Sequence, residues 1–201
     1  MGVRHLLFAG FRSRLRREDR GAQLVEFAVT LPLMMVFVVG IFDFSGAFTL
    51  KQKLTNIARD AARAAAAEPA SDLANSLPVS VSDTFQAVKN YLATNNINDC
   101  GIAAPVHSTG LTWKSTATVN CVTPGLILTI NRGYYFPQTG AGLPSVTCVS
   151  QAPGGQTAII GTCVSIQYPY PWRFGRVASL LGSAVALPTE ISATAVAMNE
   201  N

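Results

Sequence analysis

Charge and histidine are both scarce in this sequence. Only 13% of its 201 residues are charged, 49% are hydrophobic, and the two histidines are His5 and His107. It has no GxSxG, HExxH, phosphate-binding loop or paired acidic motif, and a histidine beside a serine, as in "VHSTG", rarely aligns as base and nucleophile. We therefore expect a protein that is not an enzyme, with no cofactor, no metal and no small-molecule substrate.

Cysteine is limited to four residues, none of them in a CxxC pair, so the close ligand spacing of a zinc site is missing. An even number of cysteines in a small domain fits two disulfides in an oxidising compartment. Three pairings are possible, and we favour the sequence neighbours, each closing a loop worth roughly 3 kcal/mol. Four buried free thiols are the alternative. The candidates are Cys100, Cys121, Cys148 and Cys163.

Net charge is absent from most of the chain. Residues 1–21 hold six arginines against two acidic residues, whereas the rest is balanced at nine basic and nine acidic. A nucleic-acid-binding protein would be expected to carry its basic residues on the folded domain, so we predict no nucleic-acid partner.

An uncharged and strongly apolar run extends from Phe27 to Phe42. About twenty residues are needed to cross a ~30 Å hydrocarbon core, and a helix over residues 27–46 supplies them, with Asp43 in its last turn. A buried core helix is the alternative, but nothing else in the chain is large enough to enclose it. Six arginines precede the span, so the positive-inside rule predicts a basic cytoplasmic leader over 1–21, with the remainder outside. A cleaved secretory signal is less favoured, because the apolar region is long.

Beyond the span, apolar residues recur at helical spacing, and we predict one helix over 22–68 that ends before Pro69. Residues 69–201 are expected to form an α+β domain. Ser82 and Asp83 would cap a short helix that stops by Asn95. An antiparallel sheet of about four strands would pack on the long helix. The expected strands are "TATVNCV", "LILTI", "TCVSIQY" and "ISATAVAM", the third with one buried face, and the apolar "VASLLGSAVAL" (177–187) is expected to pack against the sheet rather than on a partner or a membrane.

The opening of the hydrophobic helix carries a recognisable combination of motifs. "RGAQLVEFAVTLP" (20–32) is followed by Gly40, Asp43 and "LTNIARDAAR" (54–63). In this combination the sequence resembles the TadE-like family of pseudopilins. The matching positions include Phe27, Pro32, Asp43, Ala58, Arg59, Ala62 and Arg63.

The resemblance implies a minor pilin-like subunit of the tight-adherence, Flp-type pilus of bacteria. Its partners would be other pilin-like subunits, the pilus assembly machinery and a prepilin peptidase that cuts after Gly21. It would be a single-pass inner-membrane protein with a periplasmic domain, in some settings incorporated in a surface pilus. The alternative function is an uncleaved, membrane-anchored periplasmic scaffold or pilus-assembly accessory protein.

The cost of a charge in a bilayer suggests a role for Glu26 and for the new N-terminus at Ala22. A carboxylate at the centre of a bilayer costs about 2.5 to 3.5 kcal/mol, less near its edge, and usually has a partner. Cutting after Gly21 would leave the amine of Ala22 one helical turn from Glu26, and pairing between neighbouring subunits would set their register. Pairing of Ala22 with Glu26 within one chain is also possible, and the alternative is that Glu26 snorkels alone to the interface. For Asp43, simple exposure at the outer interface and a functional pairing are both open.

Overall fold

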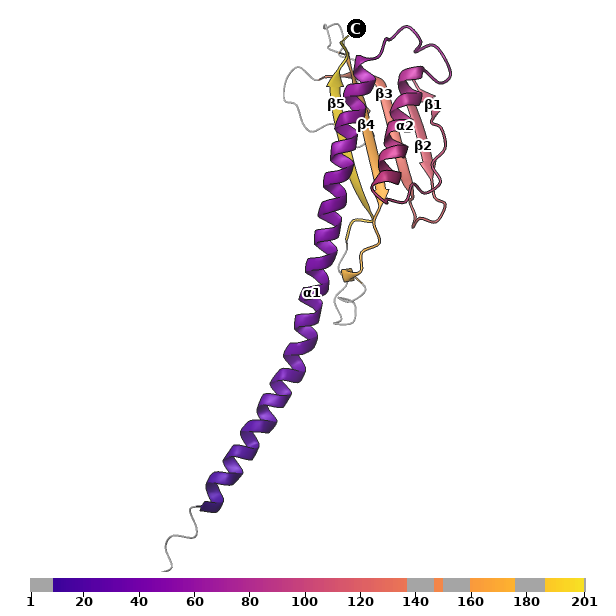
Figure 1. Cartoon of the computed structure of the whole chain (residues 1–201). Helices are drawn as coiled ribbons and strands as arrows, with labels where there is room; N and C mark the ends of the chain where they lie inside the picture. The colour runs from indigo at the N-terminus through magenta and orange to yellow at the C-terminus, as the bar shows by residue number, and fades with distance from the viewer. Residues whose placement is uncertain (1–8, 137–146, 150–159, 176–186, 201) are drawn as a thin grey trace, which may run out of the picture. The chain divides into compact units, whose positions relative to one another are not determined.

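The computed structural model describes residues 9–136, 147–149, 160–175 and 187–200. Helix α1 spans Ala9–Ala67 and helix α2 spans Val79–Thr94 (Figure 1). Five strands follow: β1 (Val106–Thr109), β2 (Thr112–Ala117), β3 (Leu126–Tyr135), β4 (Ile160–Pro169) and β5 (Glu190–Met198). The predicted α+β class, with a long helix and an antiparallel sheet, is confirmed.

The chain forms two compact units. The first comprises residues 1–44 and 173–186, and the second comprises residues 45–172 and 187–201. Helix α1 contributes its N-terminal part to the first unit and its C-terminal part to the second. The segment "VASLLGSAVAL" falls almost wholly outside the described residues.

Helix α1 begins earlier than expected. It starts at Ala9 rather than near Ala22, and it continues without a break through Gly21 and Pro32 to Ala67. Residues 11–20 contain neither glycine nor proline and are rich in arginine, a good helix former, so the local sequence favours the extension. The predicted end ahead of Pro69 is confirmed.

The sheet is a five-stranded antiparallel meander in the order β1-β2-β3-β4-β5. Strand β1 was not predicted. The strand predicted at "TATVNCV" lies too late in the sequence, because β2 ends at Ala117 and the rest of that segment forms the connection to β3. Gly110, at a φ of 54°, makes the tight turn between β1 and β2. That glycine, ahead of the alternating Thr112, Trp113 and Lys114, was the usable hairpin signal.

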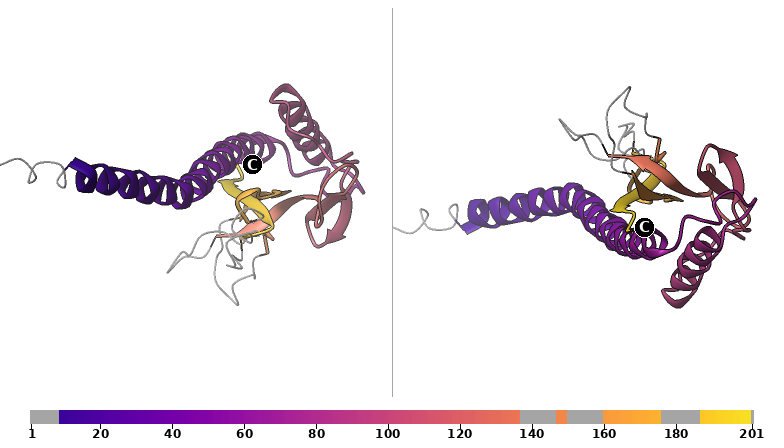
Figure 2. Two further views of the ribbon diagram at one scale, coloured as in Figure 1. Left: turned by 90° about the horizontal axis from the view of Figure 1, so that it is seen from below. Right: turned by 90° about the horizontal axis from the view of Figure 1, so that it is seen from above.

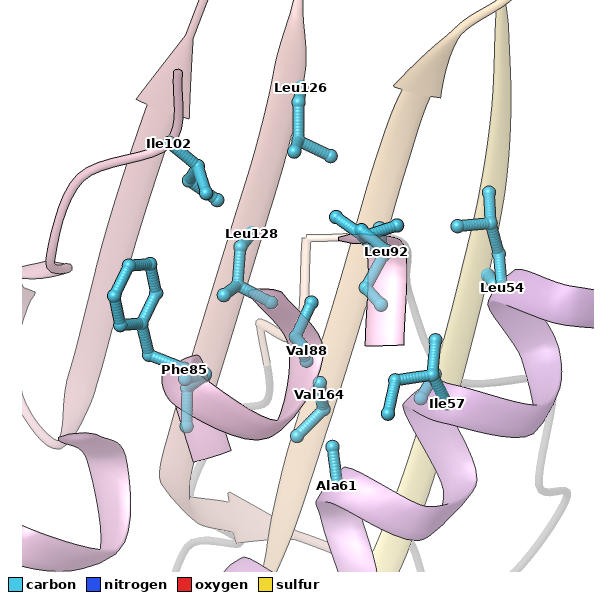
Figure 3. Packing of buried hydrophobic residues seen from close by; sticks show 14 of the residues in the cluster. Leu54, Ile57, Ala61, Phe85, Val88, Leu92, Ile102, Leu126, Leu128 and Val164 are labelled. Atoms are coloured by element: carbon cyan, nitrogen blue, oxygen red, sulfur yellow. The ribbon is translucent and has the colours of Figure 1, made fainter. Parts of the chain in front are cut away.

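Both helices of the second unit cover the same face of the sheet, the end of α1 over β4 and β5 and α2 over β2 and β3 (Figures 1 and 2). The core lies between these two layers. Figure 3 shows Leu54 and Ile57 of α1, Val88 and Leu92 of α2, and Leu128 and Val164 of the sheet pointing into it. All six side chains are buried.

The C-terminal part of α1 is amphipathic in the predicted way. Leu54, Ile57, Ala58, Ala61 and Ala65 are buried, while Lys51, Arg59, Asp60 and Arg63 are exposed. Alanines at this spacing let the helix backbone approach the sheet closely. The backbone N–H of Glu200, just after β5, donates to the carbonyl of Ala66 (3.3 Å) and attaches the end of the helix to the end of the chain.

Strand β4 is buried on both faces over Gly161–Ile166, so the prediction of a single buried face is wrong. Val164 and Ile166 point towards the helices, and Cys163 points to the other face of the sheet. There Cys163 forms a disulfide with Cys148, and the pair packs with Tyr134. Alternate side chains of β4 do point to opposite faces of the sheet, as predicted, but both faces of this strand are buried.

The second disulfide joins Cys100, just after α2, to Cys121, between β2 and β3. No described cysteine is free, and the two pairs are the sequence neighbours that we favoured. Helix α2 begins at Val79, so the expected cap at Ser82 and Asp83 is wrong, although the end at Thr94 agrees. Its first turn is capped from a distance, because the Val79 N–H donates to the carboxylate of Asp72 (2.6 Å).

Candidate functional site

The N-terminal part of α1 exposes a large apolar surface. The exposed large apolar side chains from Leu24 to Phe44 each have 44% to 74% of their surface accessible, and they include Phe27, Phe37 and Phe42. Within the described residues, α1 is the one helix long and apolar enough to cross a membrane, judged by its length and composition over Gly21–Ala67. So large a contiguous apolar surface is typical of a site that contacts a membrane or another protein.

Gly21 lies inside this helix without a structural need for glycine. A Cβ at Gly21 would meet no atom within 4 Å, and its φ is not in the positive range. Glycine inside a helix is less favourable than alanine by about 1 kcal/mol. Among the described residues, neither packing nor backbone conformation requires a glycine at this position.

Ala22 and Glu26 follow on one face of α1, four residues apart, and both are exposed. Phe27 is also exposed, and Pro32 is accommodated within the helix. The carboxylate of Glu26 therefore lies on the same surface as the apolar side chains. A neighbouring helix could reach it there.

Asp43 is buried, whereas one of our predictions left it exposed at the outer end of the span. Its side chain is only 7% exposed. The Oδ2 atom accepts hydrogen bonds from the backbone N–H groups of Arg173 and Phe174, both at 2.8 Å. The simple-exposure interpretation is wrong, because a segment 130 residues later in the chain returns to cover this carboxylate.

Two more residues of α1, Gly40 and Phe44, lie against Phe174 of that segment. A Cβ at Gly40 would come within 3.1 Å of the Phe174 ring, and the rings of Phe44 and Phe174 have centroids 6.0 Å apart. Gly40, Asp43 and Phe44 are close on one side of the helix, so the absence of a side chain at Gly40 makes room for Phe174. We call Gly40, Asp43, Phe44, Arg173 and Phe174 the Asp43 clamp.

The remaining motif residues lie in the second unit. Ala58 and Ala62 are buried in the core, with 0% and 1% of their surface exposed, whereas Arg59 and Arg63 are exposed. The alanines of "IARDAAR" are thus explained by packing. The arginines are on the opposite face, accessible to a partner.

The isolated "VHSTG" motif is part of the β1–β2 hairpin. The Nε2 atom of His107 lies 2.7 Å from the carbonyl oxygen of Gly110, and its ring contacts Trp113 edge to face. The register of β1 with β2 shifts between His107 and Thr109, so Ser108 lies at an irregular position of the strand. No group of three metal-ligating side chains gathers anywhere in the part of the chain that the structure describes.

Sequence reasoning missed Arg132, which is 1% exposed in β3. Its guanidinium donates to the carbonyl of Glu68 (2.8 Å), at the end of α1, and to Oγ1 of Thr162 (3.3 Å) on β4. Burial lowers the pKa of Arg132 from its ordinary value, while the carboxylates of Asp72 and Glu68 act in the opposite direction. An arginine within an otherwise apolar strand was the available signal.

These features define a class of protein: a small, disulfide-bonded α+β domain that continues into one long apolar helix. Residues 21–63 match the family model described as TadE-like protein, so the suspected resemblance is confirmed over that segment. The match begins at Gly21 and includes Glu26, Asp43 and the arginines of "IARDAAR". The match covers 43 of the 201 residues and ends within α1. Comparison with curated proteins and with solved structures returned no match.

Proposed function

We propose that this chain is a pilin-like inner-membrane subunit that takes part in assembling a tight-adherence, Flp-type pilus, and that a prepilin peptidase cuts it after Gly21. The observation that carries the proposal is the surface of α1 from Gly21 onwards. There a glycine without a packing role, an exposed carboxylate at Glu26 and a continuous exposed apolar surface occur together. The TadE-like match over the same residues supports it.

The proposed topology follows from charge. The arginine-rich segment before Gly21 stays in the cytoplasm, residues 27–46 cross the inner membrane, and the disulfide-bonded domain is periplasmic. Two disulfides in the domain are in keeping with that oxidising compartment. Cleavage removes the basic segment, which eases extraction of the helix into an assembly.

Cleavage is tested on the chain extracted from the membrane of a host that carries the pilus system. Intact-mass and N-terminal analysis should find a chain that begins at Ala22. The variant Gly21→Ala should remain uncut, and since a Cβ at this position meets open space, its fold should be unchanged. Gln23→Ala is the matched control: it lies two residues away, is also exposed, and should be cut normally.

A chain that keeps residues 4–20 in such a host would contradict the pilin role. That result would favour the second candidate, a permanently anchored scaffold. Equal processing of the parent and Gly21→Ala would assign the cut to another enzyme.

A further inference from the structure

The Asp43 clamp has a defined place along the helix. Asp43 follows Glu26 by 17 residues, or about 26 Å at 1.5 Å per residue. A hydrocarbon core is ~30 Å thick, so a span with Glu26 at one boundary brings Asp43 close to the other. Because the backbone N–H groups of Arg173 and Phe174 donate hydrogen bonds to Asp43, these two residues also lie at this boundary.

The hydrogen bonding of the clamp suits a site with little water. A backbone N–H without an acceptor is costly in a bilayer. The carboxylate of Asp43, 7% exposed, is costly there too unless it has partners. At 2.8 Å each, the two N–H groups and the carboxylate satisfy one another.

The clamp also brings an aromatic and a basic side chain next to each other, Phe174 and Arg173. Phe174 packs on Gly40, three residues closer to the middle of the span than Asp43, and beside Phe44. Arg173, next to it in the chain, is exposed. Neighbouring aromatic and basic side chains are typical of membrane interfaces, where basic residues are attracted to anionic lipids.

We propose that the Asp43 clamp is a second membrane contact at the outer surface of the bilayer. Asp43 holds the segment there, Phe174 enters the edge of the hydrocarbon, and Arg173 binds lipid phosphate. The inference rests on the proposed function, because α1 must span the bilayer for the clamp to reach its surface. It gives the chain a fixed depth in the membrane, set by contacts from two distant segments.

The test uses the full chain in vesicles of phosphatidylcholine and phosphatidylglycerol. Phe174→Trp in a Trp172→Phe background reports on the clamp, and the remaining Trp113, 0% exposed in the domain core, gives a constant signal. Lipids brominated near the headgroup end of the acyl chain should quench the emission of the residue-174 reporter. The background variant alone should not be quenched.

Two further substitutions address the clamp itself. Adding Asp43→Ala removes the acceptor, and adding Gly40→Leu fills the space under Phe174; each should abolish the quenching. Near-ultraviolet circular dichroism of Trp113 checks that the domain stays folded, and Gly40→Leu carries the test if Asp43→Ala does not fold. Quenching that persists in a folded clamp variant overturns the assignment.

A separate reporter distinguishes the two proposals. Phe37→Trp, in the same background and at a position 61% exposed within the span, should be quenched by lipids brominated near the end of the acyl chain. If this reporter is quenched and the one at residue 174 is not, the clamp proposal fails while the span stands. If neither is quenched, both fail. If the emission of the residue-174 reporter changes with the protein-to-lipid ratio but not with bromination of the lipid, the residue contacts a second copy of the chain, and the lipid proposal is overturned.

Discussion

Arg132 places a cation beside the carbonyl groups of Glu68 and Pro69, just after the end of α1. Its hydrogen bonds reach Glu68 and Thr162, so one side chain connects the end of the helix to two strands. A positive charge at a helix C-terminus is also favoured by the helix dipole. This residue explains how the long helix is fixed to the sheet at its far end.

Replacing Arg132 with methionine keeps much of the side-chain volume and removes these bonds. We expect the free energy of unfolding to fall by about 2 kcal/mol, the usual worth of a hydrogen bond to a charged group, because the carbonyl of Glu68 loses its donor. Chemical denaturation of the detergent-solubilised chain in a Trp172→Phe background, followed by the fluorescence of buried Trp113, measures it.

Lys114→Met is the matched control. Lys114 is a basic residue on the neighbouring strand β2, but its side chain is exposed, so the change should stay within about 0.5 kcal/mol. Equal effects of the two substitutions would mean that Arg132 does not stabilise the helix end.

At the scale of elements, the second half of α1 is a packing surface of alanines. Ala61 is 1% exposed and points at the sheet, as Figure 3 shows, whereas Ala64 on the same helix is exposed. Ala61→Leu should lower the free energy of unfolding by about 1 to 3 kcal/mol, the cost of extra methylene groups in a filled core. Ala64→Leu makes the same change in the same helix and should be nearly neutral. Thermal unfolding of the two variants side by side measures the difference, and equal midpoints would contradict close packing at Ala61.

Much of this architecture was predictable from periodicity. The helical spacing of Leu54, Ile57 and Ala61 gave the buried face of α1, and Pro69 gave its end, because both depend on local sequence. The start of α2 was not predictable, since its first N–H is capped by Asp72 from outside the helix. Likewise the burial of Asp43 depends on residues 173 and 174, far away in the sequence.

At the scale of the whole molecule, the proposed function predicts that membrane retention and assembly make opposite demands on Glu26. A charged side chain in the bilayer costs up to about 2.5 to 3.5 kcal/mol, so Glu26→Ala should hold the chain in the membrane at least as firmly as the parent. If the amine of Ala22 in a neighbouring subunit is the partner of this carboxylate, the same variant should be cut normally after Gly21 and yet enter assemblies poorly. A general defect in folding would instead reduce retention and assembly together.

Asp60→Ala is the control for this experiment, because it removes an exposed carboxylate from α1 beyond the span. Mass analysis should find both variants cut, and alkaline extraction should find both retained. Chemical cross-linking to other pilin-like subunits, or recovery in sheared pili, should then decrease for Glu26→Ala alone. If Glu26→Ala assembles as well as Asp60→Ala, the carboxylate does not set subunit register, and its place near the end of the span is explained by its own access to the interface.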